Sequence, residues 1–197
     1  MNSKRMLATV ALVVSAPVML SAQAMTGTSH GMMKDQANPM VGGKAMLATK
    51  DIVDNAVNSA DHTTLVAAVK AAGLVETLKS KGPFTVFAPT NAAFAQLPAG
   101  AVDGLLKPEN KGQLTAVLTY HVVAGRYDAA ALMDLVAKGN GSATLKTVQG
   151  APLTITMNGP RNLQVADAKG RTANIAIYDV YQSNGVILVI DKVLMPN

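Results

Sequence analysis

The sequence predicts an α+β fold, with helices concentrated in the first half of the chain and strands in the second. Apolar residues recur at helical spacing from about residue 51 to residue 139, and after Asn140 they alternate with polar residues, which is the period of a strand. Strands and helices do not alternate along the chain as they do in a parallel α/β sheet. A chain of 197 residues that is 49% apolar and 15% charged can bury a sizeable core.

The first half predicts several short helices, each with one apolar face. Asp61 is expected to cap the start of a helix, which leaves His62 as a surface histidine. Pro108 suits the first turn of a helix, Asp128 begins the last helix of this half, and Gly139 ends it. The expected faces are Ile52, Val53, Ala56 and Val57; Leu65, Val66, Val69 and Ala72; Leu114, Val117, Leu118 and His121; and Ala131, Leu132, Leu135 and Val136.

The expected strands fall on both sides of residue 140. Residues 84–88 form a short strand, and Thr90 or Asn91 caps the helix that follows it. Residues 186–190 are five apolar residues in a row, which predicts a strand buried on both faces. Asn184-Gly185 predicts a hairpin with a type I′ turn, because both residue types tolerate a positive φ. The other predicted strands are residues 144–148, 153–157, 163–165 and 174–181.

The N-terminus has the pattern of a secretory signal peptide over residues 1–24. Lys4 and Arg5 precede a nearly unbroken apolar run at residues 6–20, and small residues at Ala22-Gln23-Ala24 suit a cleavage site. The apolar run is shorter than the roughly 20 residues that a membrane-spanning helix needs. We therefore expect cleavage after Ala24 and export to the periplasm or the medium.

Residues 25–47 are expected to be a flexible leader, and residues 48–197 the folded domain. The leader has few bulky branched residues and contains the chain-breaking pair Gly42-Gly43. Thioether and imidazole groups are soft ligands for Cu(I), so a copper-binding tail is one alternative function. The residues that suggest it are Met25, His30, Met32, Met33, Met40 and Met46.

Composition excludes several classes of protein. With no cysteine, the chain has no disulfide scaffold, no thiolate metal site, no thiol nucleophile and no lipoprotein anchor. The net charge of +5 falls by two when Lys4 and Arg5 are removed, and the other cations are scattered, which argues against nucleic-acid binding. Only three histidines are present, without a metal-binding pair, a nucleophile elbow or a phosphate-binding loop. The sequence therefore predicts a protein that is not an enzyme and needs no cofactor.

Three motifs in order resemble those of the fasciclin I domain family. Residues 82–94, Gly-Pro-Phe-Thr-Val-Phe-Ala-Pro-Thr-Asn-Ala-Ala-Phe, resemble the first signature, and residues 184–194 resemble the second. Tyr120-His121 lies where the family has a Tyr-His pair between them. The resemblance covers about residues 48–196 and implies a compact β-wedge with a helical layer.

The resemblance also implies a function. Family members are mostly adhesion modules of exported or cell-surface proteins, and in matrix members the Tyr-His region and an Asp-Ile pair are tied to integrin binding. The matching residues here are Tyr120, His121, Asp179 and Val180, with Val180 in place of Ile. Leu188 replaces a histidine that is frequent in the second signature. These four residues are the candidate partner-binding site, although a buried His121 with a hydrogen-bond partner would instead lock a helix end onto the sheet.

The leading hypothesis is an exported, non-catalytic adhesion module that binds a surface protein or a polysaccharide. One alternative is a binding protein for an apolar small ligand, because some algal members of the family carry carotenoids and the predicted interface between helices and strands is aliphatic. The other is copper scavenging by the methionine-rich leader.

Overall fold

A computed structural model describes residues 38–196, and the predicted signal peptide, together with residues 25–37 of the predicted leader, lies outside the described residues. The elements begin with a two-stranded ribbon, β1 (Met40–Val41) and β2 (Lys44–Ala45). The helices that follow are α1 (Ile52–Asn58), η1 (Ala60–His62), α2 (Thr63–Ala72), α3 (Val75–Lys79), α4 (Asn91–Ala95), α5 (Ala101–Leu106), η2 (Pro108–Asn110), α6 (Lys111–Tyr120) and α7 (Ala129–Lys138). The remaining strands are β3 (Phe84–Pro89), β4 (Val122–Ala124), β5 (Ser142–Lys146), β6 (Pro152–Met157), β7 (Leu163–Ala166), β8 (Thr172–Gln182) and β9 (Gly185–Ile190).

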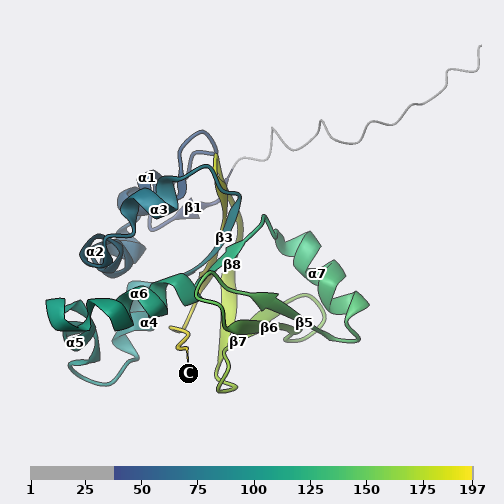
Figure 1. The fold of residues 1–197 in the computed structure, drawn as a ribbon. Helices are drawn as coiled ribbons and strands as arrows, with labels where there is room; N and C mark the ends of the chain where they lie inside the picture. The colour runs from purple at the N-terminus through teal and green to yellow at the C-terminus, as the bar shows by residue number, and fades with distance from the viewer. Residues whose placement is uncertain (1–37, 197) are drawn as a thin grey trace, which may run out of the picture. The chain divides into compact units, whose positions relative to one another are not determined.

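The larger sheet has seven strands in the order β4-β3-β9-β8-β7-β6-β5 and comes close to closing on itself. All neighbours are antiparallel except β3 and β9, which are parallel and at the centre of the fold. A bridge between Val123 and Thr147 links edge strand β4 to the segment after β5. Helices α1 to α6 lie on one side of the sheet and α7 on the other (Figure 1). The predicted α+β class is confirmed.

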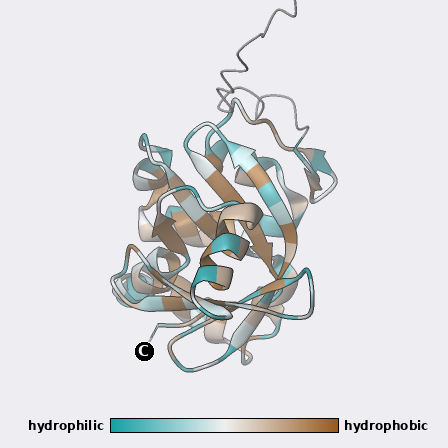
Figure 2. Ribbon diagram, turned by 90° about the vertical axis from the view of Figure 1, so that its right-hand side faces the viewer, coloured by the Kyte–Doolittle hydropathy of each residue, from teal (hydrophilic) through white to brown (hydrophobic). Residues whose placement is uncertain are grey.

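Two apolar cores lie on opposite faces of the central strands. In β9, Ile187 and Val189 pack toward the helical layer, whereas Leu188 and Ile190 pack into the core under α7, because successive side chains of a strand point to opposite faces. Every residue of β9 is buried, as the apolar run predicted. Figure 2 shows hydrophobic residues concentrated along the central strands and hydrophilic ones on the outward turns of the helices.

Several predicted local signals are present. Thr90 caps α4 by accepting a hydrogen bond from the Ala93 N–H (3.2 Å), and Asp128 caps α7 by accepting one from the Ala131 N–H (2.9 Å). Asp61, however, does not cap α2: it lies inside η1, and α2 begins at Thr63.

The predicted hairpin exists, but its turn differs from the prediction. Gln182 pairs with Gly185, so the turn residues are Ser183 and Asn184, and neither Asn184 nor Gly185 has a positive φ. A Cβ at Gly185 would collide with the backbone carbonyl of Phe84 in the adjacent parallel strand. Gly185 is therefore required for the close approach of β3 rather than for a left-handed turn.

The Asn184 side chain joins the hairpin to the helical layer. Its Oδ1 accepts a hydrogen bond from the Ile52 N–H (3.1 Å) at the start of α1, and its Nδ2 donates to the carbonyls of Leu78 (2.7 Å) and Ser80 (3.0 Å). An amide that has both donors and an acceptor can satisfy both helix ends at once.

The described part of the expected leader is folded against the domain. Val41 and Met46 are 4% and 5% exposed and belong to the helical-side core. The Asn38 side chain pairs with the backbone of Tyr181 through two hydrogen bonds of 2.6 and 2.8 Å. Residues 38–47 therefore differ from the flexible segment that their composition predicted, because two well-spaced apolar side chains anchor a short ribbon.

Candidate functional site

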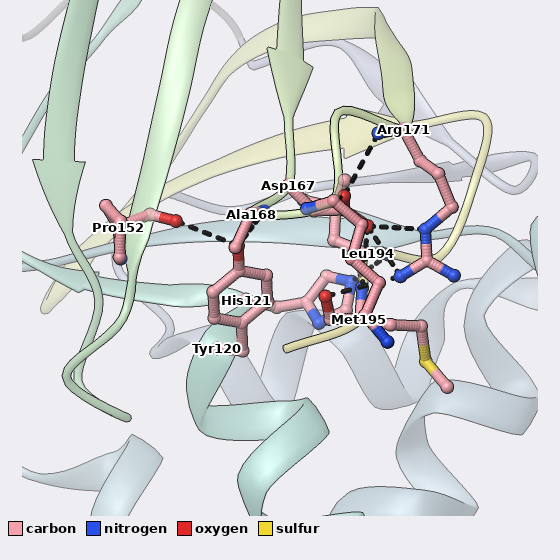
Figure 3. A network of polar contacts seen from close by, with 9 residues as sticks. Tyr120, His121, Pro152, Asp167, Ala168, Arg171, Leu194 and Met195 are labelled. Atoms are coloured by element: carbon pink, nitrogen blue, oxygen red, sulfur yellow. Dashed lines mark hydrogen bonds and ion pairs between the residues drawn. The ribbon is translucent and has the colours of Figure 1, made fainter. Parts of the chain in front are cut away.

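Tyr120 ends α6 and is fully buried in the core under α7. Its hydroxyl donates a hydrogen bond to the Pro152 carbonyl (2.8 Å) and accepts one from the Ala168 N–H (2.9 Å). Burial raises the pKa of Tyr120, and the Ala168 N–H opposes that rise. Figure 3 shows the ring reaching from the end of α6 to strand β6 and to the turn after β7. Tyr120 thus joins three separate segments.

His121 is 3% exposed, and both of its ring nitrogens have partners. Nδ1 lies 2.8 Å from the Val117 carbonyl, and Nε2 lies 3.0 Å from the Leu194 N–H, which can only donate. The ring is therefore neutral, with its proton on Nδ1. Burial lowers the pKa of His121 to about 4, against the opposing effects of the Val117 carbonyl and Asp167. This confirms the expected structural role, since His121 fastens the end of α6 to the C-terminal segment.

Asp167 lies beside this pair with a fully buried side chain. It accepts a hydrogen bond from Arg171 Nη2 (2.7 Å) and others from the backbone N–H groups of Lys169 (2.9 Å) and Met195 (3.3 Å). Burial alone would raise the pKa of Asp167, but these donors outweigh it and hold the pKa below its ordinary value. Figure 3 shows Asp167 closing the turn between β7 and β8 onto the C-terminal segment.

Asp179 and Val180 lie in an irregular part of β8, where the pairing register with β9 shifts twice between Ile175 and Val180. Asp179 has a φ of 56°, which is unusual for a residue other than glycine. Its half-buried carboxylate accepts a hydrogen bond from the Ala129 N–H (2.7 Å) in the first turn of α7. Burial raises the pKa of Asp179, and that N–H opposes the rise. Val180 is 1% exposed.

The structure brings two of the four predicted residues together. His121 and Val180 line the same apolar cavity of about 80 Å³ between the helices and strands β3 and β9. Val41 and Met46 of the N-terminal ribbon also line it. The side chain of Tyr120 enters the opposite core, and the carboxylate of Asp179, in β8, contacts the first turn of α7.

Burial therefore corrects the predicted partner-binding site. Tyr120, His121 and Val180 cannot touch a partner in this conformation because their exposed fractions are 0%, 3% and 1%. Among the four, only Asp179 has a side chain that reaches the surface in part. A motif match specifies positions in the chain, but it does not show whether their side chains point inward.

His62 is the feature that sequence reasoning missed. It was expected at the surface, yet it is 3% exposed and lines the cavity. Its Nδ1 lies 2.9 Å from Ser59 Oγ, and its Nε2 is the one buried side-chain nitrogen or oxygen among residues 38–196 that has no hydrogen-bond partner. Burial lowers the pKa of His62, opposed in part by the Ala88 backbone and by Asp61. The packing of the ribbon and helices around η1 buries this ring, and no local sequence pattern predicts that burial.

Within residues 38–196, no group of three or more His, Asp or Glu side chains is placed to hold a metal ion, and no helix is long and apolar enough to cross a membrane. Met46 is buried, so it is not free to act as a copper ligand, whereas Met40 is 64% exposed. The other leader residues of the copper hypothesis lie outside the described residues.

The chain belongs to the Fasciclin domain family, whose sequence profile matches residues 60–196. The structure is similar to the FAS1 domain pair of the insect cell adhesion molecule Fasciclin I, with a TM-score of 0.66 at 18% identity, covering 74% of this chain and 51% of that one. That similarity shows the fold alone, and it confirms the fold expected from the motifs.

Three relatives are similar to this chain over most of its length. Protein sll1483 of Synechocystis is 44% identical over 167 residues, which cover 84% of each chain. Immunogenic protein MPB70 of Mycobacterium bovis is 41% identical over 72% of this chain and 66% of its own. Cell surface glycolipoprotein MPB83 of the same species is 36% identical over 79% of this chain and 64% of its own.

Proposed function

We propose that this chain is an exported, non-catalytic adhesion module that binds a protein or a polysaccharide of the cell surface. Membership of the Fasciclin domain family supports this function, together with a relative that is named a cell surface glycolipoprotein. The positive φ of Asp179 within a strand is the observation that supports a contact surface at this part of the molecule. Such strained residues and bulges re-aim side chains and persist where the surroundings hold them.

The contact surface that we propose lies around the irregular part of β8. Arg126 is exposed, while Asp128, Asp179 and Tyr181 are half-buried. Burial is the main cause of the raised pKa of Tyr181. The negative charges of Asp179 and Asp128 raise it further and the positive charge of Arg126 opposes the rise, so the four side chains are neighbours. We call Arg126, Asp128, Asp179 and Tyr181 the bulge surface. A phenol beside both signs of charge suits recognition of hydroxyl-rich or mixed-charge partners.

An attachment assay tests this proposal. Beads coated with the chain are counted on envelope fractions of the producing cells, for the wild type and for the double variant Arg126→Ala/Asp179→Asn. Asparagine tolerates the backbone conformation of Asp179 and keeps an acceptor for the Ala129 N–H. Arg126→Ala removes a hydrogen bond from Nη2 to the Gln182 carbonyl (2.9 Å), so thermal unfolding of the variant is compared with that of the wild type. The matched control is Lys107→Ala/Glu109→Gln, which removes one cation and one anion from an exposed pair.

We expect the bulge-surface variant to lose most of its attachment and the control to keep it. Loss in both variants to the same degree, or in neither, would contradict the bulge surface as the contact. Protease treatment of the envelope before the assay abolishes attachment to a protein, and periodate oxidation abolishes attachment to a polysaccharide. If wild-type beads do not attach, the adhesion function itself is wrong.

A second candidate function is favoured by the apolar cavity. An aliphatic cavity that opens between helices and strands suits an apolar small ligand. Its volume of about 80 Å³ accommodates a small molecule or one end of a longer one such as a carotenoid, but not the whole of a carotenoid.

A further inference from the structure

The cavity on the helical side of the sheet has an almost wholly apolar wall. Side chains from α1, α2 and α3 form one side, including Val53, Leu65 and Leu78, and β3 and β9 supply Val86 and Ile187 on the other. Such a wall excludes strongly polar or charged ligands, because they would lose their hydration without replacement.

One polar atom in this wall has no partner. His62 Nε2 is buried and makes no hydrogen bond, and a buried nitrogen that is left unpaired destabilises the folded state. Nε2 of His121 accepts from the Leu194 N–H, and Thr119 Oγ1 donates to the Thr115 carbonyl, whereas Lys70 and Thr77 are exposed residues at the edge of the wall. His62 Nε2 is therefore the one buried side-chain nitrogen or oxygen of this wall, as the structure describes it, that has an unused hydrogen-bonding position.

The ring of His62 is held in place around that position. Ser59 Oγ contacts its Nδ1, and Ser59 itself lies under Gly42 of the ribbon turn, where any Cβ would collide with Oγ. The contact between Ser59 and Nδ1 is compatible with either neutral tautomer, so Nε2 either carries the proton or accepts one. A hydroxyl group both donates and accepts, and it can pair with Nε2 in both cases.

We infer that this cavity binds a small, neutral, apolar molecule that carries one hydroxyl group, with the hydroxyl paired to His62 Nε2. The inference rests on the second candidate function and specifies its ligand. A water molecule is a poorer occupant, because buried waters need two to four polar partners and His62 Nε2 is the one unpaired buried side-chain atom of this wall among the described residues.

Binding of a matched pair of probes tests the inference. Cyclohexanol and methylcyclohexane have similar size and shape, but only the first has a hydroxyl. Their affinities are measured by ligand-observed NMR for the wild-type chain, and the ¹⁵N signals of the His62 ring are followed during the titration. Because water hydrates the hydroxyl far better than the methyl group, the hydrogen bond is measured from the change between proteins. We expect loss of the His62 nitrogen to weaken cyclohexanol about tenfold relative to methylcyclohexane, which is the size of one buried hydrogen bond, and we expect cyclohexanol to move the Nε2 signal of the wild type.

Two variants separate the parts of the inference. His62→Phe keeps an aromatic ring without the nitrogen, and we expect it to weaken cyclohexanol about tenfold more than it weakens methylcyclohexane. Ala56→Leu, at a half-buried position of α1 in the cavity wall, is expected to weaken both probes while it leaves the His62 signals of the free protein unchanged. Thermal unfolding of each variant shows that it is folded. If His62→Phe is unstable, the shift of the wild-type Nε2 signal on addition of cyclohexanol is the deciding test of the inference.

The failures are distinguishable. If neither probe binds the wild type, the apolar-ligand function is wrong. If both bind, His62→Phe leaves the ratio of the two affinities unchanged and the Nε2 signal does not move, the cavity takes apolar ligands but the hydroxyl inference is overturned. If the free protein already shows Nε2 in a hydrogen bond that cyclohexanol does not alter, a bound water occupies the position and the inference is likewise overturned.

Discussion

His121 makes the stability of this protein sensitive to mild acid. In the folded state Nε2 accepts a hydrogen bond from the Leu194 N–H, so a proton on Nε2 would face another donor at a buried site. The pKa of His121 is about 4 in the folded chain and about 6.5 in the unfolded chain, because burial disfavours the charged ring. The unfolded chain therefore binds more protons between these values, and the free energy of unfolding falls as the pH falls.

The size of the effect follows from the two pKa values. The full difference corresponds to roughly 3 kcal/mol, of which about 2 kcal/mol is lost between about pH 7 and pH 5. His62 adds a loss of the same sign because burial lowers its pKa too. The pKa of Asp167 is already held below its ordinary value, so its contribution is lost only at lower pH. The free energy of unfolding in urea at each pH measures the sum.

The variant His121→Gln isolates the contribution of His121. Glutamine has a donor and an acceptor but does not titrate, so the variant is less stable at pH 7 and changes less between pH 7 and pH 5. The difference between the two slopes should be about 2 kcal/mol over that range. Equal slopes for the wild type and His121→Gln would refute the assignment of His121 as the buried neutral histidine that controls acid stability.

Three further substitutions probe the scaffold through thermal and urea unfolding. Asp167→Asn should destabilise the protein by about 3 kcal/mol, because Arg171 and the Met195 N–H lose a buried anionic acceptor, and an unchanged midpoint would show that the network contributes nothing. Gly185→Ala should cost about 3 kcal/mol or prevent folding, since its Cβ meets the Phe84 carbonyl; full stability would contradict the close approach of β3 and β9. Gly112→Ala, on an α6 surface with open space, should instead raise stability by about 0.5–1 kcal/mol, and a loss there would argue against that helix.

Much of the fold follows from local signals. The caps at Thr90 and Asp128 form because their side chains accept from N–H groups two or three residues ahead, which sequence spacing specifies directly. The burial of β9 follows equally well from its unbroken apolar run. These features depend on neighbouring residues alone, so the sequence pattern predicts them.

Contacts between distant segments were not predictable in this way. The parallel pairing of β3 with β9 joins segments about a hundred residues apart. It brings the Phe84 carbonyl so close to residue 185 that only glycine fits there. The folding of the ribbon over Ser59 buries His62, although the local pattern at Asp61-His62 is that of an exposed helix start. The cavity lies at the interface between helices and strands where the apolar-ligand alternative expected it, but His62 in its wall was not predicted, since a cavity is a property of several elements that meet.

The Tyr-His pair shows how a motif can mark a scaffold and still bear on function. Tyr120 holds the core under α7, while His121 fastens the C-terminal segment and lines the cavity on the other face, so two adjacent residues join both cores. Truncation of either side chain would reduce stability and thereby reduce any surface attachment, whether or not the residue touches a partner. Only variants with unchanged stability can assign a contact. The exposed and half-buried groups around Asp179 allow such variants, whereas the buried motif residues do not.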